Sequence, residues 1–140
     1  MKQYLYLLTP LFAWFITGCI KFAFNCVKER RLAFDLIGYG GMPSNHSAIV
    51  SSIAMMIALR EGIDTPALGV AVALAFIVML DANSLRQKIG QQARLLNQVS
   101  ANLNLTNKPL RERMGHSKFE ILAGIVSGCV SAYLLLILIG

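Results

Sequence analysis

Four apolar stretches divide this 140-residue chain and constrain its fold more than any other feature. They cover approximately Tyr4–Phe24, Ser47–Leu59, Ala67–Leu80 and Phe119–Ile139. At ~1.5 Å of rise per residue, the first stretch as a helix spans the ~30 Å hydrocarbon core of a bilayer. The second and third are short for a full crossing, and Gly62 and Pro66 between them predict a tight helical hairpin. The pattern predicts one domain, residues 1–140: an all-α integral membrane bundle with about four transmembrane helices.

The composition agrees with a membrane protein. Hydrophobic residues make up 56% of the chain and charged residues only 14%, whereas ordinary soluble domains are roughly 25% charged. The formal net charge is +6, and the basic residues fall in the loops between the apolar stretches. Such charges act as topology signals and attract phosphate groups or anionic membrane lipids, so nucleic acid is not an expected partner.

Two polar loops carry most of the basic residues, one at about Asn25–Asn45 and one at about Asp81–Lys118. Ten Lys and Arg residues lie in these loops, against Lys2 and Arg60 on the other side. By the positive-inside rule, both loops are expected in the cytoplasm, with the protein in a bacterial-type inner membrane.

The longer loop also contains apolar residues at helical spacing: Leu85, Ile89, Ala93, Leu96, Val99 and Leu103. On a helical wheel they share one face, which predicts an amphipathic interfacial helix lying at the membrane surface. A soluble cap packed on the other helices is an equal alternative.

The chain has only two histidines, His46 and His116, and each lies where a polar loop enters an apolar stretch. With four crossings, the two loops share one membrane face, so both imidazoles are expected on it. Ionisable residues at membrane depth are functional candidates. The alternative is that each histidine is a solvated interfacial residue.

The sequence around the first histidine reads GGMPSNHS, residues 40–47. Ser44 or Asn45 can cap the helix that follows, and the free N–H groups at a helix N-terminus attract anions. His46 then lies in the first turn, beside any bound phosphate. The alternative is an ordinary helix start.

The sequence around the second histidine reads RERMGHSKFE, residues 111–120. His116 and Glu120 are four residues apart and share a helix face. A carboxylate that accepts the Nδ1 proton fixes the tautomer and raises the basicity of Nε2, which a histidine nucleophile requires. The alternative is an exposed ion pair of little energetic weight.

These motifs resemble those of a known superfamily. PSNH at residues 43–46 is similar to the Pro-Ser-Gly-His motif of the type-2 phosphatidic acid phosphatases, relatives of the vanadium haloperoxidases. His116 followed by Glu120 is similar to their closing motif, a His followed four residues later by an Asp. The whole pattern, GGMPSNHSA and a late RERMGHSKFEILAG, more closely resembles the divergent, haloperoxidase-related branch, from about Lys21 to Gly128.

The resemblance implies a role for each motif residue. His116 would attack phosphorus and form a phosphohistidine, with Glu120 as its orienting carboxylate. His46 would protonate the leaving alkoxide and later activate water. Ser44 and the backbone around Asn45, which replaces the superfamily's Gly, would hold phosphate oxygens.

The resemblance also implies basic phosphate ligands, for which the candidates are Lys21, Arg31, Arg86 and Arg111. The Lys21–Arg31 gap is longer than the superfamily's, and Arg111 is one residue nearer to the last His. No cofactor and no metal are implied. Asp81, Glu120 and the two histidines are the alternative metal-binding set.

The sequence therefore predicts a membrane phosphatase that hydrolyses a lipid phosphate monoester through a phosphohistidine, without a metal. The alternative is a non-catalytic small membrane protein that binds anionic lipid or assists assembly. Gly124, Gly128 and Ala132 have the small-xxx-small spacing of close helix contacts. This contact could lie within the bundle or between the subunits of a homo-oligomer.

Overall fold

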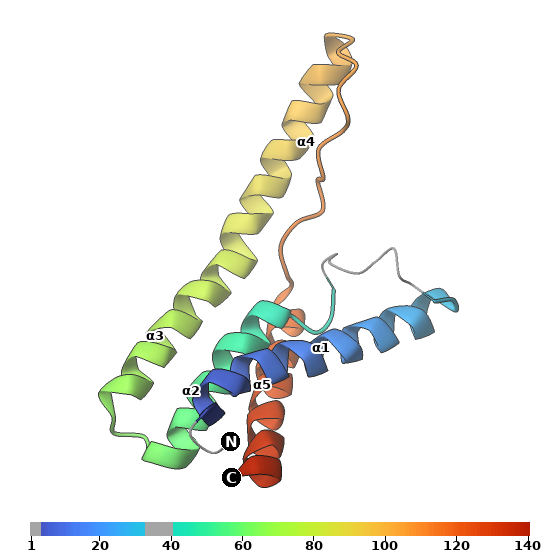
Figure 1. Ribbon diagram of the computed structural model, residues 1–140. Coiled ribbons are helices and arrows are strands. Elements are labelled where there is room, and N and C mark those ends of the chain that lie inside the picture. Colours follow the sequence, from blue (N-terminus) through green and yellow to red (C-terminus); the bar gives the residue numbers. More distant parts are fainter. Residues whose placement is uncertain (1–3, 33–40) are drawn as a thin grey trace.

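The computed structural model describes residues 4–32 and 41–140, and every regular element in these ranges is a helix (Figure 1). The elements are α1 (Leu5–Glu29), α2 (Asn45–Glu61), α3 (Pro66–Leu80), a π-helical turn η3 (Asp81–Leu85), α4 (Arg86–Asn102) and α5 (Lys118–Ile139). The all-α prediction is confirmed. Lys2 and Gly40, which entered the sequence argument, lie outside the described residues.

Three helical stretches in the described ranges are long and apolar enough to cross a membrane: α1, the continuous Pro66–Asn102 stretch, and α5. The helix α2 has 17 residues and is not among them. Three of the four predicted crossings are therefore confirmed as candidate spans by length and composition.

The first helix is longer than the sequence predicted. It continues past Phe24 to Glu29 and ends at Arg30, whose left-handed φ of 51° lets its N–H contact the carbonyls of Cys26 and Val27. The prediction that the loop begins at Asn25 was wrong. The backbone hydrogen bonds of a helix continue regardless of side-chain polarity, so α1 can extend past its apolar residues into polar ones.

The helix α2 lies at the centre of the bundle and packs against α1, α3 and α5. Two glycines of α5 face its first turns: a Cβ on Gly124 would collide with the Ser44 carbonyl oxygen, and one on Gly128 would collide with the Ala48 backbone. The small-residue spacing therefore brings α5 against α2 within one chain.

Helix α1 is joined to α5 by a hydrogen bond between the hydroxyls of Thr17 and Ser127, at 2.7 Å. Towards the end of the bundle where the two termini lie (Figure 1), an apolar cluster forms from Leu5, Met56, Ala132 and Leu135. At the opposite end, the first turns of α2 and α5 are joined by a hydrogen bond from the Ser44 N–H to the Glu120 carbonyl.

Helices α3 and α4 form one long rod through η3, and α4 projects away from the other helices (Figure 1). The chain after Asn102 returns alongside α4. The side chain of Asn97 bonds both the N–H and the carbonyl of Leu110 at 2.8 Å, and Arg94 contacts Glu112 at 3.3 Å. A helix exists over Arg86–Asn102, where the sequence predicted an amphipathic one, and its place at the membrane surface stays a prediction. The alternative that it caps the other helices is wrong, because α4 continues the axis of α3 and packs on the returning chain.

The contact between α2 and α5 can be tested with Gly128→Ala. We expect the new Cβ to force the Ala48 backbone away and to lower the free energy of unfolding by about 1–3 kcal/mol, as overpacking does. Gly18→Ala is the matched control, since a Cβ there meets no atom within 4 Å. Thermal unfolding in detergent measures both variants, and an unchanged melting temperature for Gly128→Ala would contradict the contact.

Candidate functional site

Three segments that are distant in sequence meet at the polar end of the bundle. His46 lies in the first turn of α2, and His116 lies two residues before α5, beside η3. Their ring centroids are 6.2 Å apart and the ring planes are inclined by 57°. The structure thus brings together the two histidines that the sequence placed on one membrane face.

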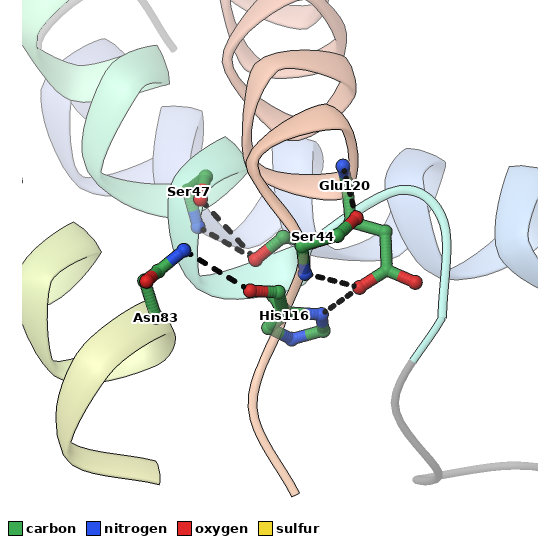
Figure 2. Close-up of polar contacts among 6 residues, drawn as sticks. Ser44, Ser47, Asn83, His116 and Glu120 are labelled. Atoms are coloured by element: carbon green, nitrogen blue, oxygen red, sulfur yellow. Dashed lines mark hydrogen bonds and ion pairs between the residues drawn. The ribbon is translucent and has the colours of Figure 1, made fainter. Parts of the chain in front are cut away.

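The start of α2 is fixed by Ser44, its N-cap. The Ser44 hydroxyl accepts hydrogen bonds from the Ser47 N–H at 3.4 Å and the Ser47 hydroxyl at 3.2 Å, and both residues are fully buried (Figure 2). The Ser44 N–H donates to the Glu120 carbonyl at 3.0 Å. This bond joins the start of α2 directly to the first turn of α5.

The start of α5 is fixed by a capping box. The Glu120 N–H donates to the Ser117 hydroxyl at 3.2 Å, and the Ser117 N–H donates to Glu120 Oε2 at 3.0 Å. The same carboxylate oxygen lies 3.1 Å from His116 Nδ1 (Figure 2). Because a carboxylate only accepts, Nδ1 carries the proton, and Nε2 is left with its lone pair.

The π-helical turn holds the main chain of His116. The His116 N–H donates to the Ala82 carbonyl at 2.9 Å, and the Asn83 side-chain amide donates to the His116 carbonyl at 3.3 Å (Figure 2). Such turns occur frequently at functional sites. Sequence reasoning missed this role, because it wrongly began the polar loop at Asp81, where the helical stretch in fact continues through η3 into α4.

The surroundings of His116 favour its neutral form. Burial lowers the pKa of this histidine, and the positive charges of Lys21 and Arg86 lower it further, whereas the hydrogen bond to Glu120 raises it. The net shift is downward from 6.5. His116 is therefore unprotonated at neutral pH, which is the form that can act as a nucleophile.

Both imidazoles line a cavity of about 260 Å³. Its walls are Trp14, Lys21, Asn45, His46, Ile49, Arg86, Arg111, Met114, Gly115 and His116. Three cationic side chains on three different segments thus face the space beside the histidines. Sequence reasoning missed the apolar members Trp14, Ile49 and Met114, because its search was limited to polar and charged groups.

Arg86 is positioned by the π-helical turn. Its Nε donates to Asp81 Oδ2 at 3.3 Å across the turn, and one terminal nitrogen lies 3.4 Å from His46 Nε2. Within the described ranges, Asn45 Oδ1 and His46 Nδ1 are buried without a hydrogen-bond partner. Buried polar atoms left unpaired are costly, and both residues line the cavity.

Two predicted phosphate ligands lie elsewhere. Arg31 is exposed beyond the end of α1 and does not line the cavity; at ~1.5 Å per residue it lies roughly 15 Å along the chain from Lys21. Ser44 is buried and uses its hydroxyl as the α2 cap. In residues 4–32 and 41–140, no group of three or more His, Cys, Asp or Glu side chains is arranged around a metal position.

The long apolar helices, and the paired imidazoles in a cation-lined cavity at one end of them, define a helical integral membrane protein with a histidine-based site. The chain belongs to the Divergent PAP2 family, whose model matches residues 3–131. It is 30% identical over 138 residues to the uncharacterized membrane protein YuiD of Bacillus subtilis (strain 168), with 87% of each chain covered. No solved structure matches significantly. The family resemblance seen in the motifs is confirmed.

The bond between Glu120 and His116 predicts a pKa change. In Glu120→Gln we expect the pKa of His116 to fall, because a negative charge that stabilises the imidazolium is lost. Glutamine still serves in a capping box, so α5 should start as before. NMR titration of the two histidines in isotope-labelled protein measures the shift, with His46→Asn assigning the signals.

Glu112→Gln is the matched control for this titration, since Glu112 contacts Arg94 and Asn97 and not His116. It should leave the pKa of His116 where it is. A pKa that stays the same or rises in Glu120→Gln would show that the carboxylate does not stabilise the protonated ring.

Proposed function

We propose that this protein is a lipid phosphate phosphatase that works through a phosphohistidine at His116. The observation that carries the proposal is the 6.2 Å approach of two imidazoles across one cation-lined cavity. A phosphoryl transfer needs a nucleophile on one side of phosphorus and a proton donor on the other. Two facing histidines supply this pair.

The reaction proceeds in two displacements. His116 Nε2 attacks phosphorus, the bond from phosphorus to the lipid oxygen breaks, and His46, which the bound phosphate dianion keeps protonated, gives its proton to that oxygen. Neutral His46 then takes a proton from water, which attacks phosphorus and breaks the P–N bond, so inorganic phosphate is released. Glu120, bonded to Nδ1 at 3.1 Å, offsets the positive charge that His116 acquires on attack.

The cavity carries the charges that this chemistry needs. A phosphate monoester is a dianion, and cationic groups around its oxygens stabilise the charge that spreads over them in the transition state. Lys21, Arg86 and Arg111 reach the cavity from three segments. The N-terminus of α2, beginning at Asn45, adds the positive end of a helix dipole.

The apolar wall supports a lipid as the substrate. Trp14 lies seven residues before Lys21 on α1, which is about two helical turns and the same face of the helix. Ile49 lies one turn below His46 on α2. A phosphate held by the cations would therefore have its hydrocarbon chain beside Trp14 and Ile49, at the level of the membrane interior. We assign the fourth crossing to α2, whose 17 residues span ~25 Å, with the site facing the cytoplasm.

Loss of the nucleophile should abolish the reaction. We expect His116→Ala to reduce phosphate release from long-chain lipid phosphates by at least about 10³-fold, because no covalent intermediate can form. His46→Gln should accumulate phosphoprotein, since the water that attacks it is no longer activated. Labelled lipid phosphate and acid-quenched protein measure both effects.

Arg31→Ala is the matched control for loss of charge, because this arginine lies outside the cavity, and it should retain activity that Arg86→Ala loses. Vanadate separates an enzyme from a non-catalytic lipid-binding protein, since it imitates the transition state and should bind tightly only to the enzyme. Full phosphate release from His116→Ala would refute the mechanism.

The apolar wall predicts a selective effect on the lipid. We expect Trp14→Ala to raise KM for a long-chain lipid phosphate by roughly tenfold. This factor corresponds to a loss of about 1.4 kcal/mol of binding free energy from apolar contact. A short, water-soluble phosphate ester should be hydrolysed as before. Phe15→Ala is the matched control, because this exposed aromatic neighbour does not line the cavity. Equal losses on both substrates would contradict the placement of the lipid chain.

A further inference from the structure

Helix α4 leaves one apolar face uncovered. Five apolar side chains of α4, or of the residue that ends it, are 40–64% exposed: Ile89, Leu95, Leu96, Val99 and Leu103. The adjacent face is occupied, because Gly90 and Ala93 are buried and a Cβ on Gly90 would collide with the Glu112 carbonyl. The returning chain therefore covers one side of α4 and leaves the other without a partner within the described residues.

The spacing of the uncovered residues indicates what kind of partner fits. Ile89, Gln92, Leu96, Val99 and Leu103 are separated by alternating steps of three and four residues. This 3.5-residue repeat keeps a narrow seam facing one other helix. On a wheel of 100° per residue the repeat covers about 80°, and the exposed Leu95 lies about 40° beyond its edge, at a position that flanks a coiled-coil core. We call these five residues the α4 seam.

We infer that the α4 seam is a self-association surface, on which two copies of this chain pair their α4 helices in parallel. Helix α4 continues α3, which lies in a candidate membrane span. All copies in one membrane share one orientation, so their α4 helices project on the same side and run in the same direction. A seam of two heptads is weak alone, and anchoring in one membrane raises the effective concentration that favours pairing.

The residues beside the seam permit a parallel pair. In such a pair the positions that flank the core are Lys88 and Leu95 on one edge and Ala93 and Ser100 on the other, so no like charges of α4 stand at opposing positions. The other cations of α4 are occupied within the chain, since Arg94 contacts Glu112 and Arg86 contacts Asp81.

One polar residue in the seam fixes the alignment of the two helices. Gln92 is exposed at a core position, and two facing glutamines can satisfy each other only when the copies are in register, as single polar core residues do in coiled coils. Near the tip, Leu105 and Leu110 of the returning chain flank Leu96 and Val99 around a groove of about 440 Å³. They extend the apolar surface that a second copy would cover.

Disulfide trapping in membranes tests the pairing. In a chain whose Cys19, Cys26 and Cys129 are replaced by serine, Leu96→Cys and Val99→Cys place single thiols in the seam. Gln91→Cys and Gln98→Cys place them on the opposite face of α4 as matched controls. We expect roughly fivefold or more covalent dimer at the seam positions than at the controls. Equal yields at all four positions, or no dimer at the seam, would overturn the inference.

A second measurement guards against chance collisions. In lipid nanodiscs or detergent, light scattering should give a dimer for the unmodified chain, a monomer for Leu96→Asp, and a more stable dimer for Gln92→Leu. Because Leu96 is 55% exposed, the aspartate should leave the thermal unfolding of the monomer unchanged. Quenching of a fluorophore on Leu96→Cys by labelled lipid tails would show that α4 lies on the bilayer, and would overturn the inference. None of these readouts depends on phosphatase activity.

Discussion

The hydrogen bond from the Ser44 N–H to the Glu120 carbonyl is the contact on which the rest of the site depends. It joins the first turns of two helices whose starts each carry one half of the histidine pair. Below it, Gly124 and Gly128 let α5 approach the backbone of α2. The close contact between α2 and α5, which larger side chains would prevent, is thus held at its end by a backbone hydrogen bond. The main chain, and not a flexible loop, therefore places the two imidazoles.

Glu120 has a structural and a chemical task at once. Its Oε2 accepts from the Ser117 N–H, which completes the cap of α5, and from His116 Nδ1, which sets the tautomer. The geometry of the proposed nucleophile is therefore tied to the geometry of a helix start. The opposite partner, His46, lies in the first turn of α2, whose start the Ser44 cap fixes.

Much of this arrangement could be predicted from the sequence. Hydropathy located the helices, the count of crossings placed both histidines on one face, and the four-residue interval paired His116 with Glu120. These predictions rest on the spacing of apolar residues and on the number of predicted crossings, both of which can be read directly from the sequence. The position of Arg31 could not be predicted, because the length of α1 beyond the apolar stretch depends on backbone hydrogen bonds that hydropathy does not report. The direction of α4 depends on η3, and the sequence of η3 gives no local signal that predicts a π-helical turn.

The turn η3 connects two parts of the molecule that are otherwise separate. Its backbone and the Asn83 amide hold the main chain of His116, and its last residue leads directly into the projecting helix α4. Any change in the angle of α4 at η3 would also move the main chain of His116, which is bonded there. The direction of α4 and the position of His116 are therefore coupled through η3.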